Sequence, residues 1–319
     1  MAKSNPPAAP VIPPAPDPSA PKYNPQPGWA DYQLWQRVRD CLAGLPVHFR
    51  TEINLPGIPA TDLHTLNTAL GAAIEDQVVR TLNLLRRTWD PKDEYSLYTF
   101  VRQPQTFPDV RLKRIAGSDT IMGFDLKGWY LLAKEAEPSL RFTATAGACA
   151  PQDLIVVAPC ALNNVISGSP LLFEPYIVSA KFAAAYRNYH WQHKRKTTSD
   201  ASINSPANAN PYPVKSDHIN DAPVSDSGNN FGRLARTGLM DIYSVKLDET
   251  TLCGIRADHW RQFLKVFQEG TTDQEATKAL ERLRAVVYQS TTISSPKAEA
   301  VLRILSDLEA LFKPEFPSS

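Results

Sequence analysis

The chain has 319 residues, with 43% hydrophobic residues, 21% charged residues and a formal net charge of +1. These values are typical of a soluble globular protein that buries a substantial core. The near-neutral charge gives no support to a nucleic-acid partner, so a local basic patch would have to supply the attraction.

The N-terminal quarter is predicted to hold a tail and two helices. Residues 1–28 contain ten prolines and predict a disordered, polyproline-like tail, either a solvated leader or a docking arm. An amphipathic helix is expected over residues 29–45. A second helix, capped by Thr61 or Asp62, is expected to run to Leu85 because apolar residues recur at steps of three and four. Glu75 lies beside that stripe, as a solvated residue or as part of a site.

Two extended segments, 107–114 and 121–133, follow a short strand expected over residues 95–102. In the second segment Asp125 and Lys127 point to the same face, because side chains alternate along a strand. A carboxylate and an ammonium group within an apolar strand are costly to bury unless they pair with each other, a metal or a substrate. The pattern therefore predicts a site.

The next segments predict the fold class. Leu140 to Ala146 and Asp153 to Leu162 are expected to be strands, and the second is continuously apolar, as in a strand buried on both faces. Strands that follow a long helix, with further helices beyond, predict an α/β fold with a central mixed β-sheet flanked by helices.

A helix expected over residues 174–193 ends in the most basic stretch of the chain. Six potential cations occur within residues 187–196, interleaved with Tyr189 and Trp191. They either compensate the helix dipole or contact DNA phosphates. A metal site at the two histidines lacks a third ligand. The six residues are Arg187, His190, His193, Lys194, Arg195 and Lys196.

The last third of the chain is expected to begin with a long polar loop, residues 197–231, which is either functional or an idle insertion. A strand over 239–247 and helices over 258–267, 273–287 and 296–312 follow. The expected organisation is thus a tail (1–28), a core with N-terminal helices (29–196), the loop, and a strand plus helical C-terminal region (232–319) packed on the core.

Several common site motifs do not occur in the sequence. It contains no Gly-rich phosphate loop, no Gly-x-Ser-x-Gly elbow and no His-Glu-x-x-His. The sequence therefore gives no support to a nucleotide-driven enzyme, a serine hydrolase or a zinc enzyme. The four cysteines are far apart, as expected for reduced thiols. With neither a signal peptide nor an apolar run of about 18 residues, we expect a cytoplasmic protein with no membrane partner.

The central segments carry a resemblance to a known family. Pro108-Asp109, fifteen further residues and Asp125-x-Lys127 resemble the motif of the PD-(D/E)xK nuclease superfamily, whose members include most type II restriction endonucleases. The resemblance spans roughly residues 60–195 and implies a restriction-endonuclease-like core. It implies that Asp109 and Asp125 bind Mg²⁺, with Mn²⁺ as a substitute and the Leu126 carbonyl as a further ligand. Lys127 would activate or orient the attacking water, and Glu75 stands where the family has an additional acid.

The function implied by this resemblance is a magnesium-dependent endonuclease that hydrolyses double-stranded DNA, most simply a sequence-specific type II restriction enzyme. Because one motif cuts one strand, a homodimer is expected, together with a partner DNA methyltransferase of a restriction-modification system. The alternative, from a different class, is a non-catalytic nucleic-acid-binding or interaction protein in which the Asp-Lys pair is structural.

Overall fold

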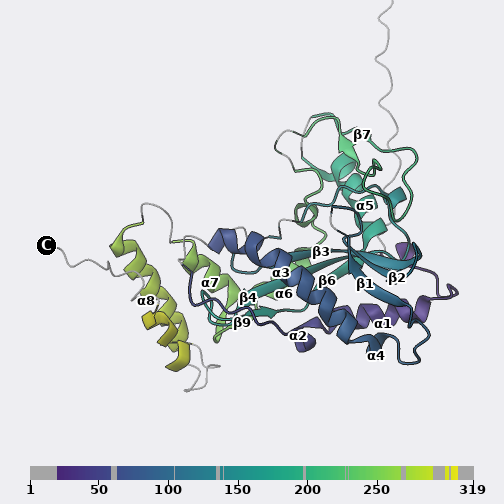
Figure 1. Ribbon diagram of the computed structural model, residues 1–319. Helices are drawn as coiled ribbons and strands as arrows, with labels where there is room; N and C mark the ends of the chain where they lie inside the picture. Colours follow the sequence, from purple (N-terminus) through teal and green to yellow (C-terminus); the bar gives the residue numbers. More distant parts are fainter. Residues whose placement is uncertain are drawn as a thin grey trace, which may run out of the picture.

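The structure is a computed structural model. It describes residues 20–58, 63–103, 105–133, 137–138, 140–196, 199–226, 228, 230–266, 271–289, 299–301 and 303–307. Within these residues a mixed β-sheet is surrounded by helices, which confirms the α/β class (Figure 1). None of the described helices has both the length and the apolar character needed to cross a membrane.

The main sheet has six strands in the described part of the chain. Their order is β1-β2-β3-β4-β5, and β6 also pairs with β4. The first three strands form an antiparallel meander, β3 and β4 run parallel, and the other edge of β4 pairs with β6 and then β5. The strands are β1 (Tyr98–Arg102), β2 (Val110–Arg114), β3 (Thr120–Tyr130), β4 (Leu154–Leu162), β5 (Pro170–Leu172) and β6 (Tyr176–Ser179).

The continuous apolar run predicted as a buried strand is β4, and every residue of it is buried. This confirms the expectation that the sheet centre is covered on both faces.

In the described part of the chain, four α-helices precede the sheet. They are α1 (Tyr32–Ala43), α2 (Leu45–His48), α3 (Leu63–Leu84) and α4 (Arg86–Trp89). The stripe predicted for the second helix faces the core in α3, where Ile74, Val78 and Leu82 are almost fully buried. Helix α3 approaches β3 closely, since a Cβ atom on Gly128 would lie 3.2 Å from Gly71 Cα.

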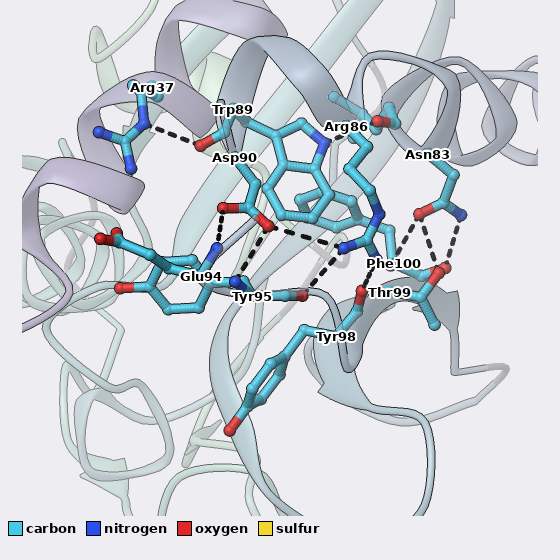
Figure 2. Close-up of polar contacts among 11 residues, drawn as sticks. Arg37, Asn83, Arg86, Trp89, Asp90, Glu94, Tyr95, Tyr98, Thr99 and Phe100 are labelled. Carbon is cyan, nitrogen blue, oxygen red and sulfur yellow. Dashed lines mark hydrogen bonds and ion pairs between the residues drawn. The ribbon is translucent and has the colours of Figure 1, made fainter. Parts of the chain in front are cut away.

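A polar network ties the end of α3 and α4 to strand β1 (Figure 2). The Asn83 amide donates to the Phe100 carbonyl over 3.0 Å and accepts from the Phe100 N–H over 2.9 Å. Arg86 donates to the Tyr95 carbonyl over 2.9 Å, and Asp90 accepts the Tyr95 N–H over 3.0 Å. The Asn83 side chain thus binds both the carbonyl and the N–H of Phe100. Because two directional hydrogen bonds restrict how the two elements can shift relative to each other, they fix α3 along β1.

The strand predicted for residues 140–146 is wrong. The backbone hydrogen bonds of this segment go to distant loops and to a side chain of the helix that follows β6, not to a neighbouring strand. The Phe142 and Ala144 carbonyls accept from Arg187, and the Thr145 N–H donates to Ile219. Only isolated bridges occur in the described part of this segment. It forms a crossover from β3 to β4 that contains the short 3₁₀ helix η3 (Ala146–Ala148).

The helix predicted for residues 174–193 is in part a strand. The β-branched pair Ile177-Val178 lies in β6 against β4, as such residues favour. Ser179 then caps α5 (Ala180–Tyr189) by accepting the Phe182 N–H over 3.3 Å. The helix ends in a π-helical turn, η4 (His190–Lys194).

The late strand predicted for residues 239–247 is also wrong, because the segment forms helix α6 (Asp241–Asp248). Asp241 stands in its first turn and Lys246 in its last, as the helix dipole favours. The β-branched side chains that suggested a strand, Ile242 and Val245, point to solvent.

The polar loop contains the first two of the remaining elements, and the described chain beyond the loop is mostly helical. The later elements are β7 (Ile203–Asn204), β8 (Ala222–Pro223), the 3₁₀ helix η5 (Leu234–Thr237), β9 (Thr251–Leu252), β10 (Ile255–Arg256), α7 (Ala257–Leu264) and α8 (Asp273–Gln289). Helix α8 confirms the helix predicted at 273–287, and it lies far from β1 and β2 (Figure 1). Residues 299–301 and 303–307 are helical, and the rest of 296–312 lies outside the described residues.

Two segments expected to be loosely attached are packed where the structure describes them. In the tail, residues 1–19 lie outside the described residues, but η1 (Ala20–Tyr23) packs the Tyr23 ring against Phe182 in a tilted arrangement, with centroids 5.5 Å apart. In the polar loop, the Tyr212 hydroxyl donates to the Ile121 carbonyl over 3.3 Å, and Pro213 accepts from Arg111 over 2.9 Å. This part of the loop is therefore anchored on β2 and β3.

Candidate active site

The predicted carboxylates and lysine meet where β2 begins beside β3. Val110 pairs with Phe124 in an antiparallel register, which places Asp109 next to Asp125. Lys127 Nζ lies 2.7 Å from Asp109 Oδ2 and 3.6 Å from Asp125 Oδ1. The side chains of Asp109 and Lys127 are 25% and 35% exposed, so water reaches both, whereas that of Asp125 is 9% exposed.

A close approach at Gly123 fixes the position of Asp109. A Cβ atom on Gly123 would lie 2.4 Å from Pro108 Cγ and 2.9 Å from the Val110 carbonyl oxygen. The Gly123 N–H donates to the buried Asp153 carboxylate over 2.9 Å. Only glycine lets Pro108 pack this closely on β3, and Asp109 follows Pro108 directly.

Glu75 comes to the same place from α3. Its carboxylate pairs with Arg102 at the end of β1, with 2.6 Å between Arg102 Nη2 and Glu75 Oε2. Burial raises the pKa of Glu75, while the charges of Lys127 and Arg102 lower it and that of Asp109 raises it. Glu75 therefore lies within electrostatic reach of the three motif residues, and its part in a metal site stays a prediction.

The electrostatics of the cluster decide which groups carry protons. Burial, followed by the negative charge of Asp109, raises the pKa of Asp125 well above its usual range, and Lys127 opposes this only in part. Burial lowers the pKa of Lys127, but the carboxylates of Asp125 and Asp109 outweigh it and raise the pKa overall. Lys127 is thus a protonated donor in this arrangement and not a free base.

One oxygen of the cluster lacks a partner. Asp125 Oδ2 is buried and accepts no hydrogen bond from the described residues. Burial, the charge of Asp109 and a side-chain hydrogen bond with Asp109 favour the protonated form of this acid, so its ionised form requires a bound cation. Carboxylate oxygens are the ligands that Mg²⁺ prefers. However, no group of three or more His, Cys, Asp or Glu side chains in the described ranges is placed to hold a metal ion. Leu126 lies between the two motif residues with a buried side chain, and its carbonyl ligation stays a prediction.

The six predicted DNA-contacting cations are divided by the structure. Arg187, expected among the cations that compensate the helix dipole or contact DNA phosphates, is instead buried: it is 1% exposed and its guanidinium pairs with the buried Asp221. Its nitrogens also donate to the carbonyls of Phe142 and Ala144 and to Asn188. Arg187 ties α5 to the crossover and to the polar loop, and it is not available to a phosphate.

The other five cations lie toward solvent. Lys194 and Lys196 are exposed, and His190, His193 and Arg195 are half-buried. Lys194 Nζ lies 5.4 Å from the centre of the Tyr189 ring, which is a cation–π contact.

Sequence reasoning missed Arg102, which neutralises Glu75, and Asp153, which supports Gly123. Neither carries a signal in its local pattern, because each role depends on packing between elements distant in sequence. Burial raises the pKa of Asp153 to about 7, against the backbone N–H groups of Ala150 and Gly123 that lower it.

Comparisons with known proteins leave the resemblance without independent support. The chain matches no protein-family model, no curated protein and no solved structure. A functional assignment therefore depends on the motif and on the geometry described above.

Proposed function

We propose that the protein is a metal-dependent endonuclease that hydrolyses phosphodiester bonds of double-stranded DNA. The observation that carries the proposal is a partly exposed cluster of three acids and one lysine, which come from α3, the start of β2 and β3. The four residues are Glu75, Asp109, Asp125 and Lys127. The placement of α3 before the antiparallel β1-β2-β3 meander also accords with a restriction-endonuclease-like core.

The donor set suits magnesium chemically, and Asp125 Oδ2 offers an unpaired oxygen. Asp109 and Asp125, with Glu75 next to them, would hold the ion, which would supply positive charge at the scissile phosphate and activate a water molecule. Lys127 would keep its proton and donate hydrogen bonds, either to orient the water or to stabilise charge on the phosphate. Arg102 pairs with the Glu75 carboxylate beside this cluster.

Finer assignments are also proposals and derive from the resemblance. They are sequence specificity of the type II restriction kind, a homodimer that cuts both strands, Mn²⁺ as a substitute metal and a partner DNA methyltransferase.

A second candidate function has its own support. Lys127 already bonds Asp109 directly, and no set of three ligand side chains in the described chain is arranged for a metal. This is the arrangement expected if the cluster is a structural ion pair in a non-catalytic nucleic-acid-binding or interaction protein.

Cleavage of supercoiled plasmid DNA with and without Mg²⁺ separates the two functions. We expect magnesium-dependent cleavage that is lost in Asp125→Ala and in Lys127→Ala. Asp119→Ala is the matched control, because Asp119 is an exposed acid in the turn before β3 and pairs only loosely with Arg114, at 3.5 Å. It should cut like wild type. Absence of cleavage by the wild-type protein, or unchanged cleavage by Asp125→Ala, would favour the structural ion pair.

A further inference from the structure

A cavity of about 290 Å³ lies at the end of α5, away from the motif residues in sequence. One wall is formed by the end of α5, the π-helical turn and three residues after it, Arg195, Lys196 and Ser199. The other wall is formed by Asp226, Asn230, Gly232, Arg233, Arg236 and Thr237. The α5 region stands on one side of the sheet together with the β7 strand (Figure 1).

The walls of this cavity are strongly cationic. Five arginine or lysine side chains line it, against one carboxylate, that of Asp226. Arg187 is neutralised by Asp221, and Arg236 pairs with Glu137 at 2.7 Å. Asp200 also lies within electrostatic reach of Arg195, whose charge contributes, after hydrogen bonds from Ser202, to lowering the pKa of the Asp200 carboxyl. The five cations are Arg187, Arg195, Lys196, Arg233 and Arg236.

Arg195 and Lys196 form no ion pair with a carboxylate of the described residues. Arg195 donates only to backbone carbonyls, those of Ser199 and Asp200, at 3.1 Å and 2.7 Å. Lys196 makes no hydrogen bond or ion pair with a described residue. Burial and the charges of Lys194 and Arg195 lower the pKa of His190, which also lines the cavity. The region is therefore positive enough to disfavour one more cation.

Trp191 provides a second, independent observation. It lines the cavity and is 7% exposed, and its indole N–H is buried with no acceptor among the described residues. The Arg195 guanidinium lies over its ring, 3.8 Å from the centre, which holds the cation at the wall. A buried donor without a described acceptor, next to the Arg195 guanidinium, favours negative charge at this wall.

We propose that this cavity binds a phosphate group. Arginine and lysine side chains with an N–H donor form the recognition chemistry of phosphate oxygens. The volume is near the lower end of small-molecule pockets, roughly 300–1,000 Å³, which suits a phosphate with its attached sugar and not a duplex. The phosphate belongs either to a free nucleotide or to the end of a nucleic-acid strand. The inference does not depend on the proposed nuclease function.

The test is thermal unfolding of the full chain in sodium phosphate and in sodium chloride of equal ionic strength. Phosphate should raise the midpoint for wild type, with binding about tenfold or more weaker in Arg195→Ala/Lys196→Ala, because charged hydrogen bonds are lost. Lys194→Ala is the control, since Lys194 is exposed and does not line the cavity. Equal weakening in the control, or no midpoint shift in wild type, would overturn the proposal.

A second readout does not require the variants to fold identically. The indole N–H resonance of Trp191, assigned with Trp191→Phe, should shift on addition of inorganic phosphate. Competition by a 5′-phosphorylated oligonucleotide but not by its 5′-hydroxyl form would identify a strand end, and tighter binding of a mononucleotide would identify a free nucleotide. Asp125→Ala should bind phosphate like wild type, so failure of the nuclease proposal leaves this test intact. A stationary Trp191 resonance would count against the site.

Discussion

Replacing Gly123 by alanine should disturb the proposed active site without removing any of its functional groups. The added Cβ would lie 2.4 Å from Pro108 Cγ and 2.9 Å from both Pro108 Cβ and the Val110 carbonyl oxygen. Carbon atoms in contact prefer about 3.5–4.0 Å, so Pro108 would have to move by roughly 1 Å. Asp109 would move with it, away from its 2.7 Å contact with Lys127.

Two magnitudes follow from this displacement. Overpacking of a well-filled core costs about 1–3 kcal/mol, so the free energy of unfolding should fall by that amount. A catalytic group misplaced by about 1 Å loses about 100-fold in rate. We therefore expect Gly123→Ala to fold at room temperature, to be less stable and to cleave DNA about 100-fold more slowly at saturating Mg²⁺.

Urea unfolding followed by circular dichroism measures the stability, and plasmid nicking measures the rate. Gly28→Ala is the matched control, because its Cβ would meet no heavy atom within 4 Å, and it should match wild type in both assays. If Gly123→Ala also matched wild type in both, the packing of Pro108 on β3 would not position Asp109, and the reasoning would fail.

Other predictions concern the helix contact and pH. At the α3–β3 contact, Gly71→Ala should stabilise the protein by about 0.5–1 kcal/mol, because Gly71 lies in a helix interior and an added Cβ meets nothing within 4 Å. Gly128→Ala should destabilise it by about 1 kcal/mol, because the added Cβ would lie 3.2 Å from Gly71 Cα. Equal effects of the two variants in urea unfolding would contradict this. Because the pKa of Asp153 is raised to about 7, the folded state holds a proton that an unfolded aspartate loses near pH 4. That stability is complete below about pH 4 and is lost as pH rises through about 7. Unfolding free energies from pH 4 to 8 should fall less steeply in Asp153→Asn, and a steeper fall would refute this.

The parts of the fold that were predictable from sequence are those whose pattern is set by burial alone. Helix α3 has an apolar stripe at helical spacing, and β4 is apolar throughout. In each case the pattern predicts which faces of the element are packed against the core. The segments 140–146 and 239–247 were mispredicted because alternation of apolar residues does not reveal where backbone hydrogen bonds go. In the first, the Phe142 carbonyl is taken by a side chain from α5, which no local pattern encodes.

The candidate site was predictable to a similar extent and for a related reason. Asp109, Asp125 and Lys127 lie on two consecutive antiparallel strands, so a short loop and the period of two bring them together. The pairing of Glu75 with Arg102 depends on how α3 lies along β1, which is fixed by Asn83 and other contacts distant from the site.

The basic segment shows how charge density in a sequence overstates what is available to a polyanion. Arg187 is directed inward, where removing it would leave the Asp221 charge buried and unpaired. The π-helical turn then places the cations after it toward solvent and toward the segment 226–237. Of the permanently charged side chains in the segment, three thus reach solvent, namely Lys194, Arg195 and Lys196. The net charge of the chain is only +1. The fold places Arg195 and Lys196 beside Arg233 and Arg236, which are distant in sequence from the basic segment. Attraction of phosphate is therefore a property of how the two segments pack, and it would be lost if either moved.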